Sequence, residues 1–270
     1  MFQGIVDEDI KKDNEEFEKE ENSKRINFKN FFSISNIILY TISFMVSMVS
    51  FGGKFAPFGL AIFAAACSNG IPAIIIYVIT LIGTLVGFGV SEFLNYFLTS
   101  LVFIVSILLF RTKYEYKDRN EKLKLGKHVL ISTLVVNLAK MFFGIFLVYD
   151  LLSSISFSII SYIFYKIFTN SITVIKDYGK KQAFTIEEVI GASLILSIAL
   201  YSLHGLNVFG LSISNILSIM LVLFLGWKYG MLVGATSGIT IGMVIGIIGD
   251  QGIVLIAAYA ISRNGGRNIK

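Results

Sequence analysis

Long apolar runs separated by short polar stretches make up most of the chain after residue 30. A helix that crosses about 30 Å of hydrocarbon needs about 20 mostly apolar residues. The runs are apolar on every face and do not alternate with polar positions, so they are unlike the strands of a membrane barrel. The pattern predicts an all-α, polytopic transmembrane bundle of nine or ten helices within residues 31–262. The predicted segments are 31–51, 57–67, 73–90, 94–110, 128–149, 151–169, 186–203, 208–225, 231–248 and 253–261.

The second of these segments is too short for an ordinary crossing. Residues 57–67 are apolar, but the stretch 68–72 interrupts the run with Asn, Gly and Pro. Such a piece is either a short span that borrows its flanking residues or a re-entrant half-helix. Counting it as a crossing gives ten segments, the last of them stunted.

The polar stretches carry the topological information. Residues 1–30 hold nine acidic and six basic residues, which predicts an acidic cytoplasmic tail and not a basic-started signal peptide. With that tail inside and ten crossings, the basic loops 111–127 and 176–181 both fall on the cytoplasmic side, as positively charged loops should. The polar stretch 263–270 follows the last apolar piece.

Composition narrows the class of protein further. Apolar residues make up 55% of the chain, charged residues only 15%, and the mean hydropathy is +0.76. The net charge of +5 comes from bases at the ends of apolar segments and not from a clustered basic face, so it does not indicate a nucleic-acid partner. One cysteine cannot form an intrachain disulfide. The sequence contains no phosphate-binding loop, zinc motif or nucleophile elbow, so we expect no catalytic, cofactor or metal site in it.

A glycine stripe is the most regular motif of the chain. Glycines recur at every fourth position from residue 230 to 246, and a weaker pair stands at Gly83 and Gly87. Because glycine has no Cβ, such a face lets a second helix approach closely. We expect intrachain packing, with self-association and a flexible hinge as the alternatives. The helix-packing candidates are Gly83, Gly87, Gly230, Gly234, Gly238, Gly242 and Gly246.

Charges deep in the predicted segments are scarce. Lys140 is the candidate intramembrane charge, because it lies mid-way along the segment 128–149, where it could snorkel or pair with an acid. Glu187 and Glu188 open another segment, and Thr185 with Glu188 has the spacing of a capping box. Most other ionisable groups fall at predicted helix ends.

Three stretches, taken in order, resemble a known family. They are Gly-Lys-Phe-Ala-Pro-Phe-Gly-Leu-Ala from residue 53, Phe-Thr-Ile-Glu-Glu-Val-Ile-Gly from residue 184, and Gly-Ala-Thr-Ser-Gly-Ile-Thr-Ile-Gly from residue 234. Together they resemble the membrane region of the stage II sporulation protein E family, in a clostridial type. The resemblance covers about residues 28–262, and 263–270 then have the look of a truncation scar before the soluble domains of the family.

The resemblance implies a function for the family that this chain would serve only in part. Family members carry a manganese-dependent serine phosphatase domain of the PP2C type, which activates the first forespore sigma factor by dephosphorylating the anti-anti-sigma factor. They also associate with the tubulin-like division protein at the asymmetric septum. We therefore expect a multi-pass membrane anchor without enzyme activity of its own, in contact with the lipid bilayer. The alternative is a small-solute transporter or a membrane subunit of one.

Overall fold

The computed structural model describes residues 33–50, 56–110, 119–143, 148–176 and 185–248. Helices account for nearly all of them, so the predicted all-α fold is confirmed. The chain divides into two compact units, Met1–Ile37 and Ile38–Lys270. The elements are α3 (Ile34–Ser47), α4 (Pro57–Ser68), α5 (Ala73–Leu109), α6 (Arg119–Phe143), α7 (Val148–Lys176), α8 (Ile186–Tyr201), β1 (Asn207–Val208), β2 (Leu211–Ser212), α9 (Ile213–Tyr229) and α10 (Met231–Ile248).

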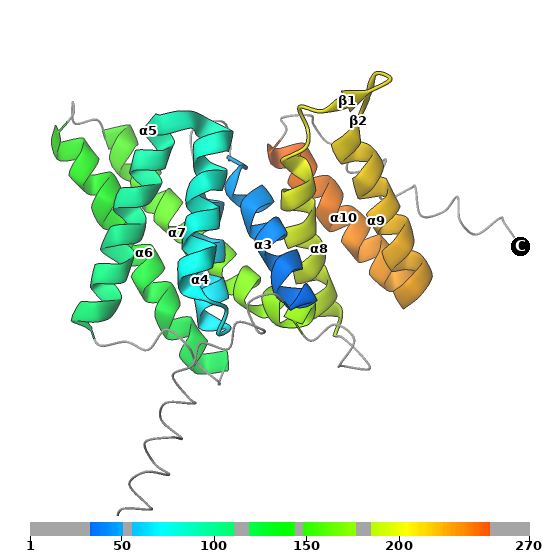
Figure 1. Ribbon diagram of the computed structural model, residues 1–270, viewed down its shortest axis with the longest axis horizontal. Coiled ribbons are helices and arrows are strands. Elements are labelled where there is room, and N and C mark those ends of the chain that lie inside the picture. Colours follow the sequence, from blue (N-terminus) through cyan, green and yellow to red (C-terminus); the bar gives the residue numbers. More distant parts are fainter. Residues whose placement is uncertain (1–32, 51–55, 111–118, 144–147, 177–184, 249–270) are drawn as a thin grey trace, which may run out of the picture. The chain divides into compact units, whose positions relative to one another are not determined.

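Helix α5 is two antiparallel arms joined at one glycine. Gly89 has φ 75° and ψ −169°, which is not helical, and the chain reverses there. The hydroxyl of Tyr96 lies 2.7 Å from that of Thr80, and Ser100 donates to the hydroxyl of Tyr77. These pairs straddle Gly89 symmetrically, and Figure 1 shows the two arms side by side. The arms match the two predicted segments 73–90 and 94–110.

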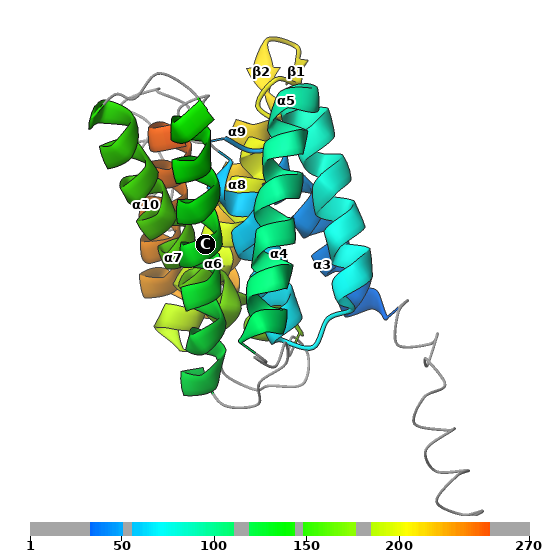
Figure 2. The same ribbon diagram turned by 90° about the vertical axis from the view of Figure 1, so that its left-hand side faces the viewer.

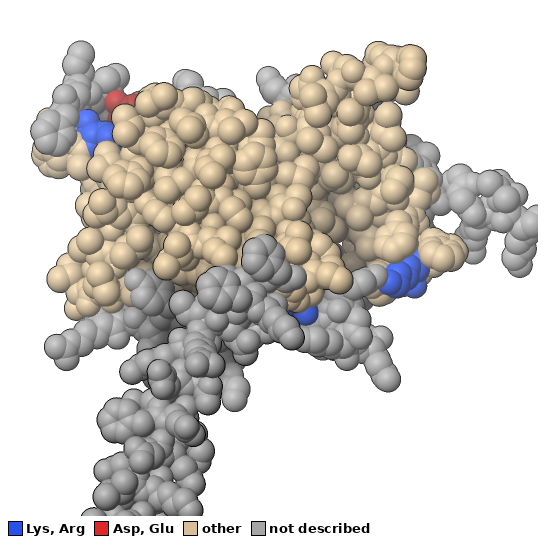
Figure 3. Space-filling model, in the orientation of Figure 1, with Lys and Arg blue, Asp and Glu red and all other residues tan. Residues whose placement is uncertain are grey.

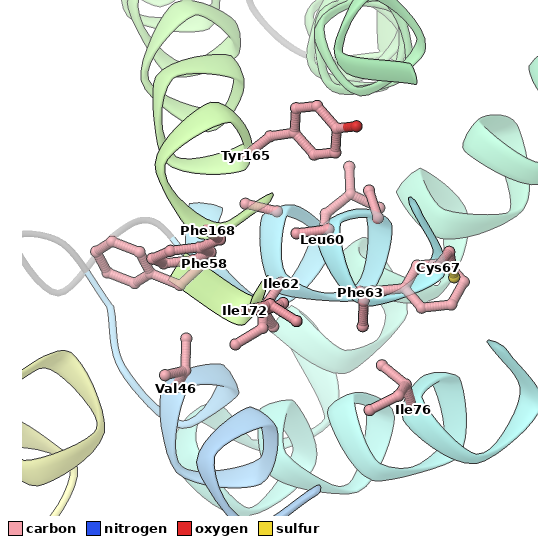
Figure 4. Close-up of a cluster of buried hydrophobic side chains, with 14 of the residues drawn as sticks. Val46, Phe58, Leu60, Ile62, Phe63, Cys67, Ile76, Tyr165, Phe168 and Ile172 are labelled. Atoms are coloured by element: carbon pink, nitrogen blue, oxygen red, sulfur yellow. The ribbon is translucent and has the colours of Figure 1, made fainter. Parts of the chain in front are cut away.

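The short helix α4 forms the centre of the larger unit. All twelve of its residues are buried, and it packs against α5, α6 and α7. Its ring contacts run from Phe58 with Phe164 of α7 to Phe63 with Phe103 of α5. Figure 4 shows α4 side chains surrounded by residues of the neighbouring helices. A helix of twelve residues is only about 18 Å long, which is less than the hydrocarbon thickness of about 30 Å. One end of α4, its N-terminus, therefore lies inside the bundle.

The C-terminus of α4 is fixed by backbone and side-chain bonds. Gly70 has φ 71°, and the amides of Gly70 and Ile71 donate to the carbonyls of Cys67 and Ala66. This is the Schellman pattern, which satisfies carbonyls at a helix end. The side-chain amide of Asn69 donates to the backbone carbonyl of Thr169 at 3.1 Å. The ammonium of Lys176 donates to the backbone carbonyl of Asn69 at 2.7 Å. The stretch 68–72 is therefore a tight turn held against α7.

Helices α8, α9 and α10 pack together beside α7 (Figures 1 and 2). The hydroxyl of Tyr201 lies 3.4 Å from the carbonyl of Ile248, so α8 and α10 end together. A short antiparallel hairpin of β1 and β2 joins α8 to α9. The capping box at the start of α8 is confirmed, because Thr185 and Glu188 exchange both hydrogen bonds.

Several element boundaries differ from the prediction. Helix α6 begins at Arg119, nine residues before the apolar run, and α7 continues to Lys176. Charged residues on a terminal helical turn can extend into water, so they do not stop the helix as the hydropathy pattern suggests. Asp150 lies in the first turn of α7 and not between two helices, where its carboxylate favours the helix dipole. The predicted segment 208–225 starts as a hairpin, and its helix runs from Ile213 to Tyr229. The predicted tail 1–30 and the pieces 253–261 and 263–270 lie outside the described residues.

Three helical elements in the described ranges are long and apolar enough to cross a membrane: Ala73–Leu109, which comprises the two arms of α5, Lys124–Phe142 and Val148–Lys176. Helices α3, α4, α9 and most of α10 are apolar but shorter. Helix α4 packs against the long helices, whereas α9 and α10 pack with one another and with α8, which in turn packs against α7. The arrangement is in keeping with the predicted polytopic architecture.

Candidate functional site: glycine seams and a polar cavity

Gly83 and Gly87 lie where the first arm of α5 meets the end of α3. A Cβ at Gly87 would stand 2.7 Å from the carbonyl oxygen and 2.8 Å from the Cα of Met48. A Cβ at Gly83 would stand 2.7 Å from the carbonyl oxygen of Phe44. Because the atoms in the way are backbone atoms, neither position has room for a side chain. The two helices therefore approach one another through these glycines.

The glycine stripe of α10 faces other helices of the same chain at its start. Gly234, Gly238, Gly242 and Gly246 are all buried. A Cβ at Gly234 would stand 2.6 Å from the Cα of Gly226 in α9. Val222 of α9 packs in one cluster with Ile241 and Ile245 of α10. At this end of the stripe, the partner helix is α9.

Gly230 has a conformational role, unlike Gly234, which allows close helix packing. It lies between α9 and α10 with φ 90° and ψ 174°, and a Cβ there would have no atom within 4 Å. This backbone region is essentially restricted to glycine. Gly230 therefore reverses the chain between two antiparallel helices, as Gly89 does in α5.

Lys140 lies in the last turn of α6 and is exposed. The prediction placed it mid-way along a segment that ran to Tyr149, but the helix ends at Phe143. The carboxylate of Glu92, just after the reversal in α5, interacts electrostatically with the ammonium group of Lys140. Lys140 is therefore a charge near one end of the bundle and not at its middle.

A polar cavity opens at the N-terminus of α4. The helix starts with Pro57 and has no side-chain cap at Ala56. The carboxylate of Glu92 accepts a hydrogen bond from the amide of Asn95 at 3.1 Å, and the Oδ1 of Asn95 is buried without a partner. The cavity has a volume of about 50 Å³. It is lined by Ala56, Pro57, Leu60, Glu92, Asn95, Tyr96, Thr99, Thr133, Asn137, Phe157 and Ser161.

The size and chemistry of this cavity limit what it can hold. A water needs roughly 10–15 Å³ of such space, so the cavity has room for a few waters. Waters there would satisfy both the uncapped amides of α4 and the oxygen of Asn95. Among the residues that the structure describes, no group of three or more His, Cys, Asp and Glu side chains could hold a metal ion.

Several further small residues, which the sequence analysis did not single out, also allow close contact between helices. A Cβ at Gly126 of α6 would stand 2.7 Å from the ring of Tyr162 in α7. At Gly59 of α4 it would stand 3.1 Å from the ring of Tyr96. On α9, the buried positions Ser214, Ser218 and Val222 form a four-residue row that leads to Gly226. Single glycines such as Gly59 and Gly126 give no periodic signal, so only the structure reveals those contacts. The row on α9 repeats every four residues, and its spacing is visible in the sequence.

Charge lies at the two ends of the bundle. Four lysines lie at the end where α4 terminates and α8 and α10 begin: Lys124, Lys127, Lys176 and Lys228. Glu187 and Glu188, in the first turn of α8, lie at the same end. Glu92, Asp150 and Lys140 lie at the other end. The face in Figure 3 is almost free of charge between these ends. Large apolar side chains are exposed along α5, α7 and α9, as expected for helices that face lipid.

These features define a polytopic helical membrane domain with tightly packed helices. Comparison with known families matches residues 3–262 to the SpoIIE N-terminal domain, and the chain belongs to this family. A curated relative is the stage II sporulation protein E of Bacillus subtilis (strain 168), with 28% identity over 119 residues. That alignment covers 44% of this chain but only 14% of the relative. No solved structure matches the chain.

Proposed function

We propose that this chain is the membrane-anchoring and localising region of a sporulation protein of the SpoIIE type. The observation that carries the proposal is the family match, which extends over almost the whole apolar part of the sequence. The uncharged exterior between two charged ends supports an anchor that lies in the bilayer. By resemblance, the phosphatase activity, its manganese and the contact with the division protein belong to other regions of the full-length family members.

Two experiments test this proposal in sequence. Membranes of cells that express the chain are extracted with alkaline carbonate, and an integral anchor stays in the membrane pellet. A fluorescent reporter fused to the chain is then followed in a sporulating endospore-former, with the same reporter on an unrelated membrane helix as control. Enrichment of the first reporter at the asymmetric septum supports the localising role. Release by carbonate would overturn the anchor, and an even distribution equal to the control would overturn localisation.

A second candidate function is the passage of an ion or a small solute, and the polar cavity at α4 is the observation that favours it. A buried half-helix whose N-terminus meets a polar cavity is a feature of some transporters. The volume of about 50 Å³ is too small for an organic solute in this conformation. Purified chain in vesicles loaded with a pH- or potassium-sensitive dye should give no flux above protein-free vesicles if the anchor reading is right. A flux that is abolished by Thr99→Trp, which would fill the cavity, would favour the transporter.

A further inference from the structure

The hairpin between α8 and α9 presents a strained and fully exposed aromatic ring. Val208 pairs with Leu211, and the two residues between them, Phe209 and Gly210, both have positive φ, at 52° and 80°. This is the pattern of a type I′ turn, in which Asn-Gly is the preferred sequence. A residue with a Cβ is strained in this conformation, and phenylalanine is not among the residues that adopt it routinely. Phe209 is 101% exposed, so no packing within the described chain compensates for that strain.

The hairpin continues an apolar surface of α9. Its side chains Leu206, Val208 and Leu211 are exposed together with Phe209. On α9 the exposed positions Ile216, Met220 and Leu223 lead away from the hairpin at helical spacing. At the far end stands Trp227, which is 84% exposed and is followed by Lys228 and Tyr229. Trp and Tyr next to a basic residue are typical of a membrane–water interface.

Trp227 therefore serves as a reference point for depth. From Trp227 back to Ile213, α9 rises by about 21 Å, whereas the hydrocarbon core is about 30 Å thick. The missing length is about 9 Å, and any tilt of the helix increases it. An extended strand rises about 3.3 Å per residue, so three hairpin residues supply the difference. The opposite boundary of the hydrocarbon then falls at the tip, near Phe209.

We propose that the β1–β2 hairpin inserts its tip into the lipid headgroup boundary of the leaflet opposite the basic end, with Phe209 as its anchor. The hairpin thereby completes the hydrophobic length of α9, which is too short to span the bilayer by helix alone. The partner of this exposed apolar surface is the lipid bilayer. The strain at Phe209 is offset by transfer of the apolar ring out of water.

The single tryptophan of the chain makes the proposal directly measurable. The wild-type protein and the double variant Trp227→Phe/Phe209→Trp each contain one tryptophan. Both are reconstituted in vesicles of phosphatidylcholine and phosphatidylglycerol, with lipids that are unlabelled, brominated near the headgroup or brominated deep in the chain. The variant Trp227→Phe/Leu211→Trp repeats the measurement at a position with ordinary backbone, in case tryptophan distorts the turn.

We expect tryptophan at 209 and at 211 to be quenched more by shallow than by deep bromines, to an extent similar to wild-type Trp227. Acrylamide in the water should quench all three far less than it quenches free N-acetyltryptophanamide. Strong acrylamide quenching at 209 and 211 without bromolipid quenching would place the hairpin in water, free for a protein partner, and would overturn the proposal. Failure of bromolipids to quench wild-type Trp227 would remove the reference point and overturn it as well.

Discussion

Small side chains set how closely the helices of this bundle approach. Lipid offers apolar surroundings as good as a leucine core, so helix association in a membrane depends on close van der Waals packing. The buried polar residues are mainly serine and threonine, and most of their hydroxyls bond to carbonyls three or four residues earlier, as Thr84 does to Thr80 and Ser158 to Ser154. Such residues pack like small apolar ones because their hydrogen bonds stay within one helix.

The contact between Gly226 and Gly234 is asymmetric and gives a matched pair of variants. A Cβ at Gly234 would stand 2.6 Å from the Cα of Gly226, whereas a Cβ at Gly226 finds its nearest atom at 3.5 Å. Gly234→Ala should lower the free energy of unfolding by about 1–3 kcal/mol, as overpacking does. Gly226→Ala should be neutral or stabilising by up to about 1 kcal/mol, because alanine favours the helix. Unfolding in detergent, followed by helical circular dichroism, compares them. Equal effects of the two variants would contradict this account of the seam.

Asn69 links two helices, whereas its neighbour Ser68 bonds only within α4. The amide of Asn69 donates to the carbonyls of Ala65 and Thr169, and the hydroxyl of Ser68 donates to Ala65. Asn69→Ala should destabilise the protein by about 1–3 kcal/mol, because the turn at a buried helix end loses its side-chain bond to α7 and keeps only the bond from Lys176 to the backbone carbonyl. Ser68→Ala should cost clearly less in the same unfolding measurement. A larger loss for Ser68→Ala would mean that the link to α7 contributes little.

At the scale of elements, two helical hairpins are closed by the same backbone device. Gly89 within α5 and Gly230 between α9 and α10 have nearly the same φ and ψ, in a region that other residues rarely adopt. In both cases a Cβ would meet nothing within 4 Å. The requirement for glycine is therefore conformational and not steric. The residues on both sides of Gly89 are helical, so the reversal within α5 depends on the backbone conformation of this one glycine.

Gly89→Ala tests this device without adding any clash. The backbone strain predicts a loss of about 1–3 kcal/mol in the free energy of unfolding. Gly205→Ala is the control, since a Cβ there also meets nothing and its φ lies outside the positive region. The control should leave the thermal midpoint unchanged. If Gly89→Ala unfolds at the same temperature as wild type, the turn tolerates other residues and this reading of Gly89 is wrong.

The sequence predicted the kind of elements well and their ends less well. Apolar runs located the arms of α5, and the Thr185–Glu188 spacing located the start of α8, because both signals are local. The burial of α4 could not be foreseen, because an apolar helix surrounded by other helices has the same composition as one surrounded by lipid. The cavity was missed for a similar reason: its polar residues come from α5, α6 and α7, and only the fold brings them together.

At the scale of the whole molecule, the arrangement of charge supports one orientation in the membrane. The described end with Lys124, Lys127, Lys176 and Lys228 also holds Glu187 and Glu188 but has more basic than acidic groups, while the opposite end holds Glu92, Asp150 and Lys140. Helix α4 runs parallel to the second arm of α5, since Gly59 lies against Tyr96 and Phe63 against Phe103, and it is therefore antiparallel to the first arm. Helix α4 therefore keeps the alternation of helix directions, with Lys124, Lys127, Lys176 and Lys228 at one end of the described bundle.

Cysteine accessibility tests the orientation that follows from the positive-inside rule. Cys67 is the one native cysteine and is buried, so wild-type protein provides an unlabelled background. We expect Ser91→Cys to react with a membrane-impermeant maleimide on intact protoplasts, because residue 91 is exposed just after the reversal in α5, at the end opposite Lys124. Lys124→Cys should react only after the membrane is permeabilised. Labelling of Lys124→Cys alone in intact protoplasts would invert the proposed topology, and it would place the hairpin with Phe209 in the inner leaflet.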